Sequence, residues 1–134
     1  MWIKHGKISL EDLENNIGNN TILISIMTAN NEIGTIEPIT EIAKIAKRHN
    51  VYFHTDAVQA IGNINIDLKA QGIDALSLSA HKFYGPKGCG AVYIREGIEF
   101  EREQDGGHQE KNKRGGTENV AEIVGLRECN RTCI

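Results

Sequence analysis

The run at residues 21–27 (TILISIM) is the feature that most restricts how this chain can fold. Its β-branched and apolar residues stand at both odd and even positions and so would point to both faces of a strand. We therefore expect a strand that is covered on both faces. Shorter runs with strand character follow at residues 51–55, 75–79 and 89–94. Because segments of helical pattern alternate with these runs, the sequence predicts an α/β fold, a mostly parallel sheet with flanking helices.

Three helices are expected beside this sheet. Ser9 precedes acidic residues in the manner of an N-cap and predicts a short helix over 10–16. Pro38 suits the first turn of a second helix, in which apolar residues recur at helical spacing. The residues of this stripe are Ile39, Ile42, Ala43, Ile45 and Ala46. A third helix is expected over 118–129, after a long polar loop at 99–116.

Composition excludes several classes of protein. The chain has 134 residues, and its 15 basic and 18 acidic residues leave a net charge of −3. It therefore lacks the excess of basic residues that is typical of nucleic-acid-binding proteins. Its apolar runs are far shorter than the roughly 20 residues that a membrane-spanning helix needs. No apolar secretory signal opens the sequence, and the odd number of cysteines argues against a disulfide framework. We expect a cytoplasmic protein with one domain over residues 1–134 and no second domain.

Polar residues follow three of the predicted strands directly. The first strand leads into Asn30 and Asn31, the second into Asp56 and Gln59, and the third into residues 79–82 (SAHK). Ligands of open α/β sheets bind at the carboxyl ends of the strands, so these are the residues to consider for chemistry.

A lysine and a carboxylate at such an edge match the needs of pyridoxal phosphate (PLP). The cofactor needs an amine that bonds its aldehyde and an acid that keeps its ring nitrogen protonated. Lys82 and Asp56 are the natural candidates. A partly buried site favours the free amine of such a lysine, and we expect Lys82 in one. The glycine-rich stretch 85–90 (GPKGCG) allows sharp turns beside a ligand.

Four motifs carry a resemblance to a known family. They are residues 79–88 (SAHKFYGPKG), 30–34 (NNEIG), 54–59 (HTDAVQ) and 114–119 (RGGTEN), which follow the family's order at plausible separations along the chain. The first is similar to the cofactor-lysine signature of cysteine desulfurases, which are fold-type I PLP enzymes of the class V aminotransferases. The resemblance spans residues 7–127 and identifies the chain as part of a PLP-binding large domain.

Carried over by position, the resemblance implies contacts with the cofactor ring. Lys82 would bond the cofactor and move protons on the substrate. Asp56 would pair with the pyridine nitrogen and Gln59 with the phenolic oxygen. Asn31 would lie near that oxygen and the substrate carboxylate.

The resemblance also implies a phosphate site and a dimer. Ser79 and His81 would bind the cofactor phosphate, and His81 joins Lys82 as a candidate catalytic residue. Thr117 would reach across a homodimer interface to the phosphate of the partner. No metal is implied.

The implied activity converts L-cysteine to L-alanine and leaves the sulfur on an enzyme cysteine, for iron-sulfur clusters or thiolated tRNA. A sulfur acceptor or scaffold protein is a further implied partner. The family's sulfur-accepting cysteine, its carboxylate-binding arginine and its cofactor-stacking histidine have no counterpart among these residues. We therefore expect a domain truncated at both ends, and no desulfurase activity from the chain alone.

Alternative functions remain open at this point. A selenocysteine lyase or a related PLP aminotransferase shares the lysine signature, and a non-catalytic remnant could only dimerise or bind a partner. A dinucleotide-binding domain is disfavoured because no G-x-G-x-x-G follows a strand.

Individual residues also have simpler interpretations. Asp56 can cap a helix, and Ser79 and Gln59 can bond nearby backbone. His54 and Asp56 share a strand face and could form a metal pair or part of a hydrolase triad. His108 receives no role, and Cys129 with Cys133 is a poor metal site.

Overall fold

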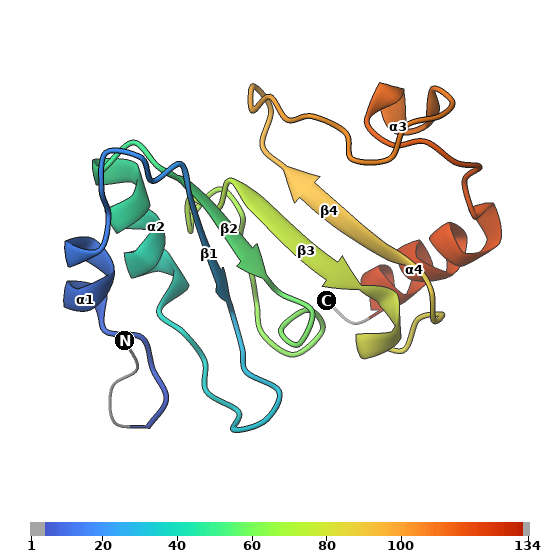
Figure 1. Cartoon of the computed structure of the whole chain (residues 1–134). Coiled ribbons are helices and arrows are strands. Elements are labelled where there is room, and N and C mark those ends of the chain that lie inside the picture. Colours follow the sequence, from blue (N-terminus) through green and yellow to red (C-terminus); the bar gives the residue numbers. More distant parts are fainter. Residues whose placement is uncertain (1–4, 133–134) are drawn as a thin grey trace.

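The computed structural model describes residues 5–132 and contains one four-stranded sheet (Figure 1). The strand order is β1-β2-β3-β4. β2 pairs in parallel with both β1 and β3, and β4 is antiparallel to β3. The mostly parallel sheet predicted from the sequence is therefore confirmed. The strands are β1 (Leu23–Met27), β2 (Tyr52–Asp56), β3 (Ala75–Ser79) and β4 (Gly90–Ile94).

Helices flank the sheet on both sides in Figure 1. The Oγ of Ser9 accepts the backbone N–H of Asp12 at 3.1 Å, which confirms the predicted N-cap. α2 packs against β2, and α4 packs against the 3-10 turn η1 that follows β3. The helical elements are α1 (Leu10–Asn15), α2 (Ile39–Arg48), η1 (Ala80–Lys82), α3 (Gln109–Asn112) and α4 (Val120–Thr132).

The core lies between α2 and one face of the sheet. All five residues of the predicted α2 stripe are buried, and Ile42 has no exposed surface. From the sheet, Ile24, Phe53 and Leu76 are buried and belong to the same cluster. Because Phe53 is fully buried, a Phe53→Ala change removes about 3–5 kcal/mol of stability in a typical core.

The prediction for the first strand is wrong in two respects. β1 begins at Leu23, because Thr21 belongs to the preceding turn, where its Oγ1 accepts the N–H of Gly18 at 3.0 Å. The strand is also buried on one face only. Ile24 packs into the core, whereas Leu23 is 50% exposed and Ser25 is exposed on the opposite face. β1 is an edge strand of this sheet, and α2 covers only its apolar side.

Within residues 5–132, none of the helices combines the length and the apolar character that a membrane crossing requires.

Candidate functional site at the carboxyl ends of three strands

The carboxyl ends of β1, β2 and β3 lie at one edge of the sheet (Figure 1). The register pairs Met27 with Asp56, and Asp56 with Ser77. Main-chain bonds continue the alignment, since the N–H of Thr28 donates to the carbonyl of Asp56 at 2.8 Å. The polar segments that follow the three strands are therefore neighbours, as the sequence predicts.

The carboxylate of Asp56 is held by its own loop and keeps one oxygen open. Oδ1 accepts the backbone N–H of Val58 at 2.9 Å, and the side chain is half-buried. Among the described residues, Oδ2 accepts no hydrogen bond. A turn and not a helix follows β2, so this bond is a local turn contact and not the helix cap of the simpler interpretation. The arrangement leaves a free carboxylate oxygen at the strand end.

Ser79 and His81 form a pair beside Asp56 on the next strand. The Ser79 Oγ and the His81 Nδ1 lie 2.8 Å apart and share a hydrogen bond. Ser79 is the last residue of β3, and His81 is the middle residue of η1. The short turn brings the two side chains together because Ala80 between them is fully buried and takes the inward position.

Lys82 closes η1 and is exposed, so the expected partly buried setting is not found. The turn places Ala80 and Phe83 in the interior, at 0% and 1% exposure, and Lys82 falls on the outer side between them. Gly85 follows closely, and its N–H donates to the carbonyl of Ala80 at 2.9 Å. Lys82 therefore starts from a tightly folded turn with its side chain in solvent.

Asn31 and Gln59 lie in the loops that follow β1 and β2. Asn31 is exposed, and its Nδ2 donates to Oε1 of Glu32 at 2.7 Å. The neighbouring Asn30 holds the loop, because its Oδ1 accepts the N–H groups of Glu32 and Ile33 at 2.8 and 3.1 Å. Gln59 is half-buried in the turn after Asp56 and makes no side-chain hydrogen bond with a described residue.

Thr117 does not join this group. It is exposed in the segment between α3 and α4, which runs on the far side of β4 from the other strand ends (Figure 1). No hydrogen bond links its side chain to the other predicted site residues among the described residues.

His54 occupies a position whose role was not predictable without the register. Its Nδ1 lies 2.7 Å from the Oγ of Ser25 and its Nε2 lies 2.7 Å from the Oγ of Ser77. Both ring nitrogens are therefore engaged by hydroxyl groups, which contradicts the metal-pair alternative for His54 and Asp56. Residues 5–132 contain no group of three or more potential ligands that could hold a metal ion. Cys133 lies outside the described residues.

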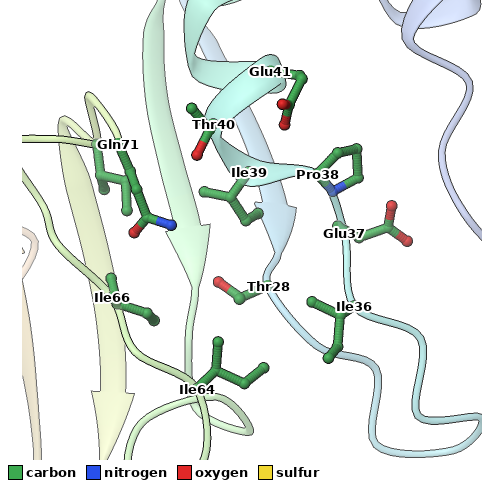
Figure 2. A pocket seen from close by; sticks show the side chains of 11 residues that line it. Thr28, Ile36, Glu37, Pro38, Ile39, Thr40, Glu41, Ile64, Ile66 and Gln71 are labelled. Carbon is green, nitrogen blue, oxygen red and sulfur yellow. The ribbon is translucent and has the colours of Figure 1, made fainter.

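Two cavities of the structure lie away from these side chains. One of about 200 Å3 adjoins the start of α2, and Figure 2 shows isoleucines such as Ile39, Ile64 and Ile66 around it. The buried Glu37 turns its carboxylate away from this space in Figure 2, and its Oε2 accepts the N–H of Ile8 at 3.0 Å. None of the seven predicted site residues lines the cavity. We place the candidate site at the strand ends because convergent polar groups, and not enclosed volume, carry the chemistry.

A larger groove of about 590 Å3 lies near the opposite, amino ends of the strands, where Tyr52, Asp74 and Arg95 contribute to its lining. The ion pair between Arg95 Nε and Asp74 Oδ1, at 2.7 Å, raises the pKa of the arginine further. This groove shares no residue with the seven site predictions.

Known proteins are similar to this chain in sequence. It is 61% identical over 123 residues to the cysteine desulfurase IscS of Methanosarcina thermophila, covering 92% of this chain and 30% of that protein. It is 59% identical over 123 residues to the cysteine desulfurase IscS of Clostridium botulinum (strain Hall / ATCC 3502 / NCTC 13319 / Type A), covering 92% and 31%. The chain thus spans about a third of the length of the curated relatives it matches.

Solved structures share the fold. One described as SspA in complex with cysteine is 45% identical, with a TM-score of 0.91 over 95% of this chain and 37% of that chain. A NifS-like protein is 44% identical, with a TM-score of 0.92 over 96% of this chain and 36% of that chain. These likenesses confirm the predicted fold class, part of a fold-type I large domain.

A family model described as Aminotransferase class-V matches residues 2–133, nearly the whole sequence. The chain therefore belongs to the class V aminotransferases, a family of PLP-dependent enzymes.

Proposed function

We propose that this chain is the cofactor-holding part of a cysteine desulfurase. The observation that carries the proposal is the meeting of Asp56, the Ser79–His81 pair and Lys82 at adjacent strand ends. The relatives named above are cysteine desulfurases that share 59% and 61% of the aligned residues, which supports this activity over a selenocysteine lyase.

The residues present fit PLP in their donors and acceptors. The open Oδ2 of Asp56 can accept from a protonated ring nitrogen, and the Ser79–His81 pair can donate to a phosphate. Asn31 and Gln59, in the loops after β1 and β2, would offer amide groups to the ring oxygen. When bound, PLP supplies an electron sink that labilises the α-proton of an amino-acid substrate.

Lys82 is the proposed proton carrier of the site. Its amine is exposed at the end of η1 and would bond the cofactor aldehyde with loss of water. Once the substrate amine had replaced it on the cofactor, the freed amine would be able to move a proton to or from the substrate α-carbon. Asp56 would keep the ring nitrogen of the bound cofactor protonated, and the Ser79–His81 pair would hold its phosphate.

The substrate and partners form part of the same proposal. L-Cysteine is the proposed substrate, and the structure described as SspA in complex with cysteine supports this choice. Homodimerisation is proposed because Thr117 is exposed and lies apart from the other site residues. Such a position suits a residue that contacts the cofactor phosphate bound by the other subunit of a dimer. We also propose a cytoplasmic location and a sulfur acceptor in cluster assembly or tRNA thiolation, as the family resemblance implies.

The test is covalent labelling of the lysine. The purified chain is mixed with PLP, reduced with borohydride and digested, and the modified peptide is located by mass spectrometry. We expect the label on Lys82. Lys87→Arg is the matched control, because Lys87 is an exposed lysine of the same motif. The control variant keeps the label and Lys82→Arg loses it. Equal labelling of several lysines, or a label that survives Lys82→Arg, would refute the proposal.

A further inference from the structure

His54 joins three strands through its side chain. It lies on the central strand β2, and its ring is hydrogen-bonded to Ser25 of β1 and Ser77 of β3, each at 2.7 Å. Ser25 is the register partner of His54, whereas Ser77 lies two residues beyond the partner Ala75, toward the carboxyl end. The ring therefore leans toward the edge of the sheet that carries the candidate site.

Ser77 is tied to the site in two further ways. It is the register partner of Asp56, and its carbonyl accepts the N–H of Ala57 at 2.9 Å. Its hydroxyl meets Nε2 of His54. Ser77 thus bonds the main chain of Ala57, just after Asp56, and the side chain of His54, two residues before Asp56. These two bonds fix β3 against the end of β2.

The two hydrogen bonds of the His54 ring, called the His54 bridge from here on, lie on the face of the sheet opposite the core. On the α2 face the strands are fixed by buried residues such as Phe53, while Leu23 and Ser25 are exposed on the face of His54. Asp56 shares this face with His54, because side chains two residues apart on a strand point the same way. The bridge is therefore a side-chain restraint on the strand face of the Asp56 carboxylate, two residues before it.

The hydroxyl partners make the bridge independent of which ring nitrogen carries the proton. A serine hydroxyl can donate or accept, so Ser25 and Ser77 satisfy either neutral tautomer and also a doubly protonated ring. The three strands remain connected in each state.

We propose that His54 is a positioning residue for Asp56: by bridging Ser25 and Ser77 it fixes the carboxylate at the strand end where the cofactor ring binds. The proposal rests on the proposed PLP site for its purpose, but the positioning itself is a property of the chain without cofactor.

The test compares His54→Phe, which keeps a ring without its nitrogens, with His54→Gln, which keeps a donor and an acceptor. Tyr52→Phe is the matched control, on the same strand and face. In the cofactor-free chain, amide hydrogen exchange at Ala57 and Val58 reports on the restraint. We expect His54→Phe to speed exchange there on the order of tenfold, and His54→Gln to restore part of the protection. In the His54 variants the amides of α2 keep their exchange rates. In the Tyr52→Phe variant Ala57 and Val58 exchange as they do in the wild type.

A second readout uses bound PLP at saturation. We expect His54→Phe to change the visible circular dichroism of the cofactor and His54→Gln to recover it in part. Unchanged exchange at Ala57 and Val58, an equal rise throughout α2, or an unaltered dichroism signal would each overturn the positioning role. Wild-type chain that takes up no PLP would instead refute the proposed function, and the exchange measurement would still decide the role of His54.

Discussion

The hydroxyl of Ser79 and the ring Nδ1 of His81 lie 2.8 Å apart, across the point where β3 becomes η1. Neither side chain is buried deeply enough for this bond to serve the core. The pair instead presents a hydroxyl and an imidazole to the same region of solvent, beside the Asp56 strand end. Two adjacent donors of this kind suit a phosphate group better than a neutral ligand.

The first prediction concerns this pair. Ser79→Ala and His81→Phe each remove one donor, and a hydrogen bond to a charged group contributes about 1.5–3 kcal/mol. We expect each change to raise the Kd for PLP tenfold or more, measured by absorbance titration. Pyridoxal, which lacks the phosphate, provides the control and loses no affinity. An equal loss for both ligands would show that the pair does not bind phosphate.

Much of the site was predictable because parallel strands impose a shared edge. The apolar runs at 51–55 and 75–79 end at Asp56 and Ser79, and once the strands are parallel and adjacent these ends must meet. The N-cap Ser9 and the buried stripe of α2 were predictable for a different reason, since both depend on local spacing within one segment. Local pattern was sufficient wherever one segment alone determined the structure.

Contacts between distant segments were not predictable in this way. The partners of His54 are 29 and 23 residues away in the sequence, so its role required the register of three strands. The exposure of Lys82 depends on which residue of η1 faces inward, and Ala80 takes that position. Burial on both faces of β1 was expected from the apolar residues at odd and even positions of the run, but burial depends on what packs against each face.

A second prediction separates the two functions of the Asp56 carboxylate. Asp56→Asn keeps an oxygen that can accept the N–H of Val58, so we expect little change in the free energy of unfolding. The neutral amide cannot hold a protonated ring nitrogen, and the Kd for PLP rises at least tenfold, in line with about 1.5–3 kcal/mol for a charged hydrogen bond.

Asp67→Asn is the control for this change. Oδ1 of Asp67 accepts the N–H groups of Lys69 and Ala70 at 3.0 and 2.9 Å, a similar local turn away from the site. We expect that variant to bind PLP as the wild type does. Comparable loss of affinity in both variants would argue against a specific role for Asp56.

The third prediction is a pH dependence of the contact between α1 and α2. Oε1 of Glu14 lies 2.7 Å from Arg48 and 3.0 Å from His49, and these hydrogen bonds lower the pKa of Glu14 below 4.5. A carboxylate with a lowered pKa stabilises the fold above its unfolded value, and the contribution is lost as the pH falls through the folded value. The contribution is small and screened by salt, because the groups are exposed.

The measurement compares wild type with Glu14→Gln in urea unfolding. We expect the wild type to be more stable at neutral pH and the two to become equal well below pH 4.5. Glu101→Gln, an exposed change outside the helices, leaves stability unaltered. A difference that persists in acid would rule out the ion pair as its source.

The last prediction concerns Gly85, whose N–H closes the turn that carries Lys82. A Cβ there would lie 2.8 Å from both the Cβ and the carbonyl oxygen of the fully buried Ala80, so the backbone of η1 must shift. We expect Gly85→Ala to cost about 1–3 kcal/mol of unfolding free energy, as overpacking does, and to weaken PLP labelling of Lys82. Gly18→Ala is the control, because nothing lies within 4 Å of its added Cβ, and it leaves both properties unchanged. A stable Gly85→Ala variant that still labels fully would mean that the tight turn is not needed to present the lysine.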